Sequence, residues 1–291
     1  MRFRQEIVLG VGGTRLLDTL NIAPKLYHCN EGHAAFMGIE RMRKLVQGEK
    51  LNFHQALEVV RASTLFTTHT PVPAGHDAFG EDLLRAYIPH YFERMGISWD
   101  YFMGMGRLNE NDSTEKFSMS YFAARLSQEI NGVSRIHGRV TQKVFLQLYP
   151  GYFAEESHIS YVTNGVHFPT WVNNRMRSLY SEHFPAEYMS EQNNAGHWQA
   201  VHQIDDQLLW DVRCAMRKDL IDTLKNRLAR EMTLRQESPV NIFKLTGKLN
   251  ENALTICFAR RFATYKRAHL LFTDLDRLSK IVNHPERPVQ F

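Results

Sequence analysis

The chain has 291 residues, of which 43% are hydrophobic and 23% are charged. This composition supports a sizeable buried core, which excludes an intrinsically disordered chain, and the length predicts about two domains. The formal net charge is +4, and lysine and arginine are spread along the sequence without a long basic block. We therefore expect no nucleic-acid partner and favour a local anionic ligand.

The three cysteines, Cys29, Cys214 and Cys257, lie far apart and form no C-x-x-C pair. This usage predicts neither a disulfide framework nor a zinc ribbon, and it favours a reducing, cytoplasmic location. The apolar run 7–13 is too short for a secretory signal, and no stretch has the length of a membrane span, so we expect no membrane partner. Residues 287–291 read as the opening of a strand without a continuation, so we expect a fragment of a longer protein.

Strand and helix patterns alternate along the first part of the chain. Residues 24–30 predict a strand that leads into a helix through 34–39, and residues 53–61 predict a second helix. The β-branched run 64–68 follows at once and predicts a buried strand. Strands that alternate with helices in this way are typical of an α/β architecture.

Two loops, a helix and a strand are expected next. Residues 70–78 and 104–113 carry the proline, glycine and asparagine residues of loops. Residues 131–148 predict one helix, because apolar residues recur there at helical spacing. The common face of this helix consists of Val133, Ile136, Val140, Val144 and Leu148. Residues 159–163 predict a further short strand, which ends at Asn164.

The composition of the sequence changes after this strand. Residues 173–203 are polar and predict irregular structure, and Asp205 is placed to cap a long amphipathic helix. The expected apolar side of this helix consists of Leu209, Val212, Met216, Leu220, Leu224 and Leu228. We place a domain boundary between Asn164 and Trp171, which divides the chain into residues 1–165 and 166–291.

Four cations gather where a predicted strand, 253–259, gives way to a helix that carries Leu270, Leu275 and Ile281. They are Arg260, Arg261, Lys266 and Arg267. Ligands of open α/β sheets bind at the carboxyl ends of strands, and the free N–H groups of a helix N-terminus favour an anion there. Solvated surface cations are the alternative, but basic side chains at a helix N-terminus oppose its dipole, which favours a phosphate site.

Two histidine-containing segments, 28–33 and 69–77, each follow a predicted strand, so both could line one cleft. Metal ligation is the less favoured reading, because neither segment has the H-E-x-x-H pattern, and we expect no metal site. Histidines that orient loops, or that hydrogen-bond sugar hydroxyls, remain the alternatives. The pairs Asn131-Gly132 and Asn164-Gly165 by themselves are explained by turn chemistry.

Taken together, five segments resemble the α-glucan phosphorylases, especially their bacterial branch. They are YHCNEGHAAF at 27–36, TTHTP at 67–71, NGVSRIH at 131–137, TNG at 163–165, and the basic stretch 261–267. The segments occur in the family's order and at similar spacing over nearly the whole chain. The ordered set is specific, although each segment alone is not.

The resemblance implies a GT-B type fold with two Rossmann-like domains, both incomplete here. Residues 1–165 would be the C-terminal part of the N-terminal domain, and residues 166–291 the N-terminal part of the C-terminal domain. It also implies transfer of a terminal α-1,4-linked glucosyl unit onto inorganic phosphate, giving glucose 1-phosphate with retained configuration. Such enzymes use pyridoxal phosphate through its phosphate group, and a homo-oligomer is a possible assembly.

The resemblance implies roles for residues in the second half of the chain. Arg261 and Lys266 resemble the residues that hold the substrate phosphate and would stabilise charge in the transition state. Tyr265 resembles a residue that contacts glucosyl hydroxyls. Arg260 occupies the position of a lysine near the cofactor phosphate, and Trp171 that of a tryptophan beside the cofactor.

The resemblance also implies roles for residues in the first half of the chain. Asn164 resembles a residue that contacts the glucosyl unit, and His33 resembles a cleft histidine with Glu31 as its possible orienter. Gln128 replaces a histidine of the family's S-H-x-V-N-G pattern and could contact the primary hydroxyl of the sugar. A second departure is Ala263-Thr264, where the family frequently has His-Glu.

The family's glycine-rich loop and the lysine that binds pyridoxal phosphate are absent from the chain. We therefore expect the chain alone neither to attach the cofactor covalently nor to turn over. A nucleotide-sugar glycosyltransferase related to glycogen synthase, in which the basic loop would hold a diphosphate, is the alternative enzyme. A non-catalytic glucan-binding fragment is the alternative from another class, and a metal hydrolase comes last.

Overall fold

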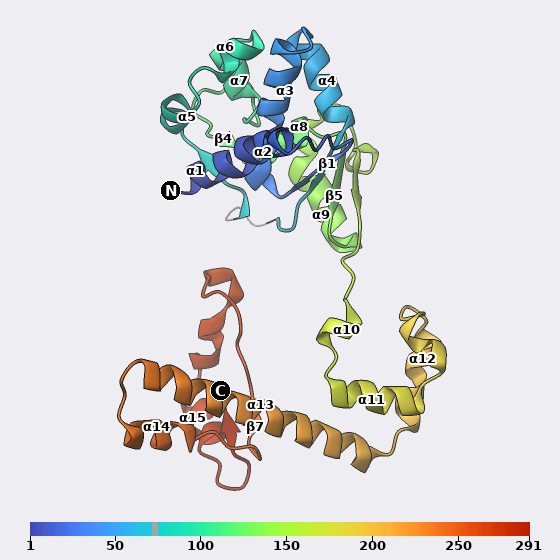
Figure 1. The fold of residues 1–291 in the computed structure, drawn as a ribbon, viewed down its shortest axis with the longest axis vertical. Helices are drawn as coiled ribbons and strands as arrows, with labels where there is room; N and C mark the ends of the chain where they lie inside the picture. The colour runs from blue at the N-terminus through green and yellow to red at the C-terminus, as the bar shows by residue number, and fades with distance from the viewer. Residues whose placement is uncertain (72–74) are drawn as a thin grey trace. The chain divides into compact units, whose positions relative to one another are not determined.

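The computed structural model describes residues 1–71 and 75–291, which form two compact units, Met1–Gly165 and Val166–Phe291 (Figure 1). Each unit has its own hydrophobic core. Residues 72–74, part of the expected loop 70–78, lie outside the described residues. Among the described residues, no helix combines the length and the apolar composition that crossing a bilayer requires.

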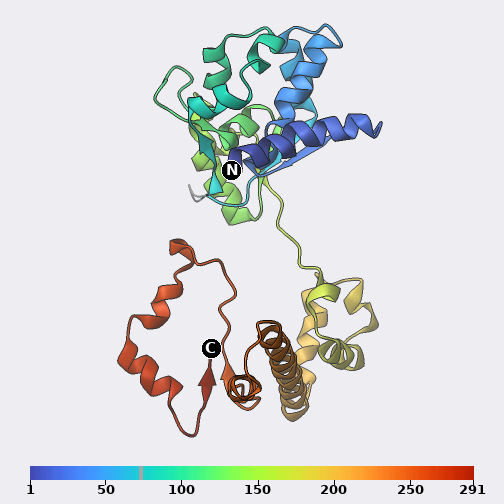
Figure 2. The ribbon, with the colours of Figure 1, turned by 60° about the vertical axis from the view of Figure 1, so that its left-hand side comes forward.

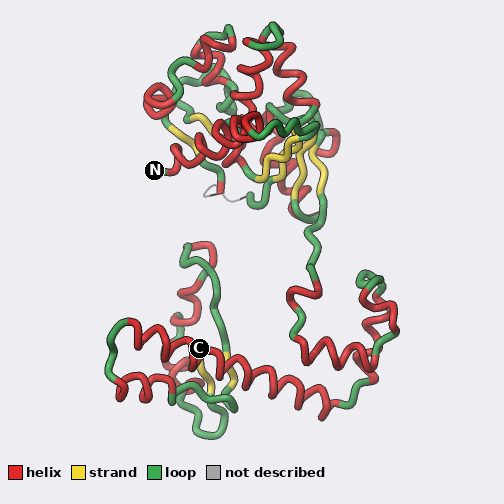
Figure 3. The backbone as a smooth tube through the Cα atoms, viewed as in Figure 1, coloured by secondary structure: helices red, strands yellow, loops and turns green. Residues whose placement is uncertain are grey.

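Unit 1 is built on a four-stranded parallel sheet with the strand order β1-β2-β5-β6, shown as yellow strands in Figure 3. The strands are β1 (Tyr27–Asn30), β2 (Thr64–Thr67), β5 (Glu129–Gly132) and β6 (Ile159–Tyr161). In the register, Asn30 pairs with Thr67, and Thr67 pairs with Asn131. All four carboxyl ends therefore lie at one edge, which confirms the expected α/β class with a parallel sheet.

Helices surround this sheet. They are α3 (Met37–Gln47), α4 (Phe53–Ala62), α8 (Met119–Arg125) and α9 (Arg135–Phe145). The expected helix 53–61 is confirmed as α4, where Asn52 and Gln55 form a capping box. The N-terminal helices α1 (Arg2–Ile7) and α2 (Gly13–Thr19) are joined by a π-helical segment, Val8–Gly12, and Figure 2 shows them as one continuous blue rod.

The rest of unit 1 consists of short elements. They are the helices α5 (Glu81–Tyr87), α6 (Tyr91–Met95) and α7 (Trp99–Gly104), and the antiparallel pair β3 (Ala78–Phe79) and β4 (Phe117–Ser118). Phenylalanine rings dominate the core: the ring of Phe117 lies 5.4 Å from that of Phe102 and 5.1 Å from that of Phe122. This aromatic core holds the short helices against the sheet-bearing part of the unit.

The expectation of one helix over 131–148 is wrong at its start. Asn131 belongs to strand β5, and α9 begins only at Arg135, where the Ser134 side chain accepts a hydrogen bond of 3.2 Å from the backbone N–H of His137. Ile136, expected on the apolar face, is 75% exposed. The error arose because apolar residues on both sides of a strand-to-helix junction happened to continue one helical period.

Unit 2 begins with a small helical subdomain made of α10 (Phe168–Trp171), α11 (Asn174–His183) and α12 (Ala195–Trp198). Its core consists of Met176, Leu179, Phe184, Tyr188 and Ile204. The expectation that 173–203 is irregular is therefore wrong. The few apolar residues of this polar stretch are large and partly aromatic, and they suffice for a small core.

The long helix expected after Asp205 is confirmed as α13 (Asp206–Leu234), and the Asp205 carboxylate accepts a hydrogen bond of 3.0 Å from the backbone N–H of Leu208. Its expected apolar side is only partly right, because Leu220 is 50% exposed while the adjacent Ile221 is fully buried. Steps of four residues advance by about 40° more than one helical turn, so a stripe spaced in fours winds around the helix.

The last part of unit 2 contains α14 (Pro239–Thr246), β7 (Leu254–Thr255), α15 (Leu275–Val282) and β8 (Val289–Gln290). Strand β7 pairs in parallel with β8. The strand expected over 253–259 is thus only two residues long, and the helix expected from Leu270 begins at Leu275 after a 3-10 segment, Ala268–Phe272. Among the described residues only β8 pairs with β7, so little sheet is present to extend the strand.

Candidate active site

The carboxyl edge of the parallel sheet brings together the two histidine-containing segments that the sequence singled out. The His69 ring nitrogen Nε2 is hydrogen-bonded to the side-chain oxygen of Asn30, the last residue of β1. The backbone N–H of His69 donates to the carboxylate of Glu31. Ligands of α/β proteins bind at this edge, so the neighbouring segments define the candidate site.

Glu31 occupies an unusual position at this edge. Its φ angle is +64°, in a region that residues other than glycine rarely adopt, and its N–H donates a hydrogen bond of 2.8 Å to the carbonyl of Thr67. One carboxylate oxygen binds the backbone of His69, and the other, Oε2, is buried without a hydrogen-bond partner among the described residues. Glu31 is therefore not the orienter of His33 that the resemblance implied, because its carboxylate binds the His69 segment.

Hydrogen bonds join polar side chains of the neighbouring strands β1, β2 and β5. The hydroxyl of Thr67 donates a hydrogen bond of 2.7 Å to Asn131 Oδ1, and His28 Nε2 lies 2.7 Å from the same hydroxyl. Asn131 Nδ2 donates to the carbonyl of Gly132 at 3.0 Å. A Cβ on Gly132 would lie 2.8 Å from both His137 Nδ1 and the backbone nitrogen of Gly138, so glycine permits the close approach of α9. This Asn-Gly pair thus serves strand pairing and packing and is not a turn.

His137, in the first turn of α9, presents an unsatisfied nitrogen at this edge. Its Nδ1 accepts a hydrogen bond of 3.1 Å from the backbone N–H of Val133. Burial lowers the pKa of His137, although the nearby Glu31 carboxylate opposes the shift. A neutral ring that accepts at Nδ1 carries its proton at Nε2, which is buried without a partner among the described residues.

Thr68 adds a third unsatisfied group, because its hydroxyl is also buried without a hydrogen-bond partner in the described part of the chain. The backbone N–H of Thr68 donates to the carbonyl of Asn131 at 3.1 Å, which places it beside the end of β5. The edge therefore offers a donor at His137, an acceptor at Glu31 and a hydroxyl at Thr68. These atoms are almost inaccessible to solvent, so a ligand with several hydroxyl groups would satisfy all three only if the edge opened to admit it.

His33 lies in a separate cluster of charged groups. Its Nδ1 is 3.2 Å from Asp77 Oδ2 and 3.6 Å from Glu6 Oε1. Arg2 Nε donates to Asp77 Oδ2 at 2.7 Å. Burial, followed by the neighbouring Asp77 carboxyl, raises the pKa of Glu6 to about 8. Asp77 is thus the carboxylate nearest to His33 in this cluster, and no local sequence signal connects the pair to Glu6.

The three groups Glu6, His33 and Asp77 also meet a geometric condition for a metal site, since one ligand atom of each lies within 4.8 Å of the others. The expectation of no metal site rested on the absence of an H-E-x-x-H helix, and it did not consider ligands from three distant segments. The charge of Arg2 already faces the two carboxyl groups.

The other predicted residues of unit 1 fall at different edges of the sheet. Asn164 follows β6, and its backbone N–H donates a hydrogen bond of 3.1 Å to the carbonyl of Val133, so it lies at the carboxyl edge. Gln128 precedes β5, and its backbone N–H donates to the carbonyl of Arg61 at 3.1 Å. The structure therefore brings Asn164 to the edge that carries His33 and leaves Gln128 at the opposite, amino edge.

The predicted residues of unit 2 lie in an exposed segment. Strand β7 ends at Thr255, and the first element after it is a short 3-10 turn, Thr264–Lys266. Arg260, Arg261 and Tyr265 are exposed. In the described part of unit 2 no α-helix begins directly after strand β7. A helix dipole therefore does not support a phosphate site at this point.

Two further positions complete the predicted set. Lys266 Nζ lies 4.8 Å from the ring centroid of Tyr265, so these two side chains are neighbours. Trp171, at the end of α10, is 77% exposed. In the described chain neither Trp171 nor Arg260 has a side-chain hydrogen bond.

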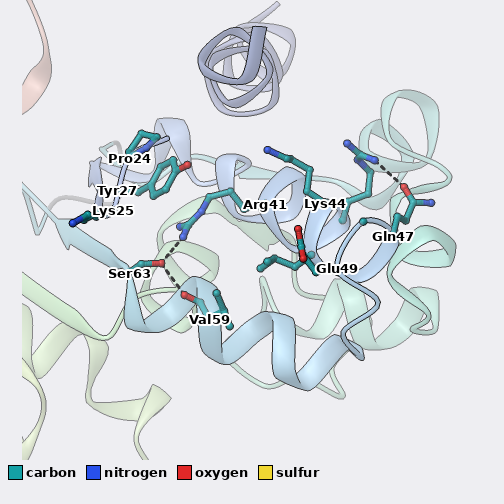
Figure 4. Close-up of a pocket in the computed structure, with 12 residues that line it drawn as sticks. Pro24, Lys25, Tyr27, Arg41, Lys44, Gln47, Glu49, Val59 and Ser63 are labelled. Carbon is teal, nitrogen blue, oxygen red and sulfur yellow. Dashed lines mark hydrogen bonds between the residues drawn. The ribbon is translucent and has the colours of Figure 1, made fainter. Parts of the chain in front are cut away.

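The largest hollow of those described lies elsewhere, between α3, α4 and the start of β1, and has a volume of about 730 Å³ (Figure 4). Arg41 lines this hollow, and its guanidinium stacks 3.7 Å above the ring centroid of Tyr27. The same guanidinium donates hydrogen bonds to Thr64 Oγ1, at 2.7 Å, and to Ser63 Oγ. Since this guanidinium already bonds to protein side chains, we assign Arg41 a structural role. The hollow is near the amino end of β1 and is not part of the candidate site.

Comparison with known proteins agrees with the resemblance. Residues 18–289 match the carbohydrate phosphorylase family. The chain is 41% identical over 289 residues to the maltodextrin phosphorylase of Thermococcus litoralis, and 38% identical over 300 residues to the glycogen phosphorylase of Mycobacterium tuberculosis. It is 35% identical over 291 residues to the glycogen phosphorylase of Aquifex aeolicus. The chain therefore belongs to the carbohydrate phosphorylase family.

These alignments cover 99% or more of the chain but only part of each relative. The chain spans 33% of the Thermococcus protein, 34% of the Mycobacterium protein and 41% of the Aquifex protein.

Proposed function

We propose that this protein acts as an α-glucan phosphorylase, which transfers a terminal α-1,4-linked glucosyl unit to inorganic phosphate and releases glucose 1-phosphate with retention. Family membership and the activities named for the relatives support this function. The structural observation that carries it is the set of three buried, unsatisfied polar atoms at the carboxyl edge, on Glu31, Thr68 and His137.

Sugar recognition follows from the chemistry of these three atoms. A buried polar group without a partner costs about 1–3 kcal/mol, so a ligand that supplies the missing partners is favoured over one that cannot. A glucosyl unit offers hydroxyls that both donate and accept, which matches the His137 donor and the Glu31 acceptor. His33 and Asn164 lie at the same edge and are proposed to contact the substrate as well.

We assign phosphate binding to Arg261 and Lys266 of unit 2. Both carry fixed positive charge, and the guanidinium fork of arginine matches two phosphate oxygens. Cations held beside the reacting phosphate would stabilise an oxocarbenium-like transition state by preorganised electrostatics. Tyr265, next to Lys266, is proposed to contact the glucosyl hydroxyls. The exposure of the segment leaves these side chains free to bind a ligand.

Phosphorylases of this family generally depend on pyridoxal phosphate, and we propose the same cofactor here. Arg260 and Trp171 are the residues assigned to it. Both side chains are exposed and, in the described part of unit 2, without hydrogen bonds to the protein. Two exposed side chains do not form a cradle, so these residues alone do not fit the cofactor.

We further propose that the two units are parts of two Rossmann-like domains of GT-B type. Unit 1 would be the C-terminal part of the first domain, and unit 2 the N-terminal part of the second. The four-stranded parallel sheet of unit 1 supports the first assignment. The match to phosphorylases along residues 18–289 favours phosphorolysis over transfer from a nucleotide sugar, and it disfavours a metal hydrolase.

A chimaera tests this function directly. Residues 1–291 would replace the matching segment of the Thermococcus maltodextrin phosphorylase, to which the chain is 41% identical. We expect maltodextrin- and phosphate-dependent release of glucose 1-phosphate by the chimaera and none by the 291-residue chain alone.

The control for the chimaera is the unmodified Thermococcus enzyme assayed in parallel. A folded chimaera that binds its cofactor but releases no glucose 1-phosphate would contradict the proposal. Turnover of a nucleoside diphosphate glucose by the chimaera, without a response to phosphate, would favour the glycosyltransferase alternative.

A further inference from the structure

Four charged or ionisable side chains from three distant segments meet around His33. Arg2 and Glu6 come from α1, His33 follows β1, and Asp77 immediately precedes β3. Asp77 Oδ2 lies 2.7 Å from Arg2 Nε and 3.2 Å from His33 Nδ1. Glu6 Oε1 lies 3.6 Å from each of the same two nitrogens.

The same three segments are locked together by aromatic packing beside the charged groups. Phe3 of α1 lies 5.6 Å, between ring centroids, from Phe36 and 4.8 Å from Phe79. Phe36 follows the His33 segment, and Phe79 follows Asp77, so each polar contributor has an apolar anchor a few residues away. Buried rings in edge-to-face contact leave little freedom, and the geometry of the cluster is therefore preorganised.

We propose that Asp77, held by Arg2, is a positioning residue that fixes the Nδ1–H tautomer of His33 and leaves Nε2 to accept a hydrogen bond from a sugar hydroxyl. The inference rests on the proposed function, because it concerns how His33 meets a glucan. Asp77 Oδ2, at 3.2 Å, is the nearest acceptor to Nδ1 of the groups in this cluster. Arg2 Nη2 is almost equidistant from the two ring nitrogens, at 3.4 and 3.5 Å, so it does not select a tautomer.

The charge balance of the cluster fits this role. Glu6 is 3% exposed, and both of its oxygens are without hydrogen-bond partners among the described residues. Since burial and the Asp77 carboxyl raise the pKa of Glu6 to about 8, Glu6 is mostly neutral near pH 7. Asp77 then carries the single carboxylate charge, which the guanidinium of Arg2 balances.

A divalent cation bound by Glu6, His33 and Asp77 is the competing explanation, because their ligand atoms lie within 4.8 Å of one another. The observations favour the cluster without a metal. Arg2 already donates to the Asp77 oxygen that a metal would need, and a cation would have to displace this guanidinium. Metal binding therefore enters as an outcome of the test.

The test uses the complete 291-residue chain labelled with ¹⁵N in its histidine rings. Proton–nitrogen NMR spectra at pH 7 report the tautomer of His33 in the wild type, Asp77→Asn, Asp77→Glu and Glu6→Gln, with the exposed Asp82→Asn as the matched control. We expect the Nδ1–H form in the wild type, Glu6→Gln and Asp82→Asn. In Asp77→Asn the Nε2–H form should appear, and Asp77→Glu, which keeps a carboxylate, should restore the Nδ1–H form.

Titration of the same samples with maltoheptaose gives the second readout. We expect an affinity about tenfold lower in Asp77→Asn and nearly unchanged in Glu6→Gln and Asp82→Asn. Circular dichroism excludes unfolding as the cause, and Asp77→Glu keeps the test decisive when Asp77→Asn does not fold.

The outcomes that overturn the inference are distinct. An unchanged His33 tautomer in Asp77→Asn overturns the positioning role, whether or not glucan binds. Stoichiometric shifts of His33 and loss of its ring N–H on addition of Zn²⁺ or Mn²⁺ at micromolar concentration overturn it in favour of a metal site. A wild-type chain with the Nδ1–H form but no glucan binding overturns the sugar-acceptor role, whereas the release of glucose 1-phosphate by the chimaera tests the proposed function separately.

Discussion

The hydroxyl of Thr67 donates a hydrogen bond of 2.7 Å to the side-chain oxygen of Asn131, joining the carboxyl ends of two neighbouring strands. Both side chains are 6% exposed. The bond forms within the candidate site, between the strand that leads to His69 and the strand that leads to His137. It therefore couples the stability of unit 1 to the geometry of the candidate site.

Replacement of Asn131 should destabilise unit 1. In Asn131→Ala the buried Thr67 hydroxyl loses its acceptor, so we expect a loss of about 1–3 kcal/mol in the free energy of unfolding. Urea dependence of hydrogen exchange at the amides of β2 and β5 measures it. The exposed Asn111→Ala is the control, with an expected change within about 0.5 kcal/mol. Equal effects of the two substitutions would contradict the assigned role.

Glu40→Gln should destabilise unit 1 more strongly. Glu40 is fully buried and accepts hydrogen bonds from Arg15 at 2.9 Å, from Arg43 at 2.7 Å and from the hydroxyl of Tyr91 at 2.7 Å. Burial alone would raise its pKa, but the hydrogen bonds from Arg43, Arg15 and Tyr91 outweigh burial and lower the pKa to about 2. Removing the charge leaves its partners uncompensated, so we expect a loss of about 3 kcal/mol at pH 7.

The pH dependence of this effect has a defined sign. The folded pKa of Glu40 is below its ordinary value of 4.5, so its stabilisation is present above pH 4.5 and disappears as the pH falls toward 2. Urea unfolding of the wild type and Glu40→Gln at pH 7 and pH 3 measures the difference. Glu58→Gln, which breaks the exposed pair with Arg61, is the control and should change stability by less than about 1 kcal/mol.

Glu6 should produce the opposite pH dependence. Its folded pKa is raised from 4.5 to about 8, so between these values the folded state holds a proton that the unfolded state has lost. The contribution of Glu6 is fully present below pH 4.5, and stability falls as the pH rises through the interval, by at most about 1.4 kcal/mol per pH unit. Glu6→Gln should remove this component, whereas parallel stability profiles from pH 5 to pH 8 in the two proteins would refute the prediction.

Gln128→Ala tests the one predicted sugar contact that lies at the amino edge of the sheet. Because His33 and Asn164 lie at the opposite edge, we expect the KM of the chimaera for maltodextrin to be unchanged. His33→Ala is the comparison and should raise KM about tenfold, since a buried polar contact to the sugar is lost. A rise in KM caused by Gln128→Ala would instead support the contact with the primary hydroxyl implied by the resemblance.

Arg261→Ala and Lys266→Ala should each reduce kcat/KM for phosphate in the chimaera by about 10²–10³, the effect of removing a preorganised charge from a transition state. Stability should not change, because Arg261 is exposed and Lys266 only partly buried. Arg277→Ala, which removes an exposed cation from α15, is the matched control. Equal activity of all three variants would remove the phosphate assignment.

Some features could be read from the sequence because neighbouring residues encode them. The Asn52 capping box starts α4, and Asp205 caps α13, since a cap needs only a side chain and a backbone N–H a few residues away. The strands β1 and β2 follow from short apolar and β-branched runs, and they predict the shared edge where the two histidine-containing segments meet.

Element boundaries were decided by tertiary packing instead. Residues 131–148 have one helical period in sequence, yet Asn131 joins β5 because β2 and β6 offer backbone partners on both sides. Conversely, residues 256–259 have strand-forming side chains but lie beyond the two-residue pairing of β7 with β8. A strand exists only where another strand pairs with it, and this information is not local.

The sequence by itself determined the α/β class of the chain, its membership of the phosphorylase family and the segments that form the candidate site. Only the tertiary structure decided which side chains meet there. It placed His33 beside Asp77, bonded Glu31 to the His69 backbone and buried Glu6 in the cluster with no hydrogen-bond partner among the described residues. These contacts join residues from distant segments, and their energies depend on burial and on the dielectric surroundings, which arise only when the chain is packed.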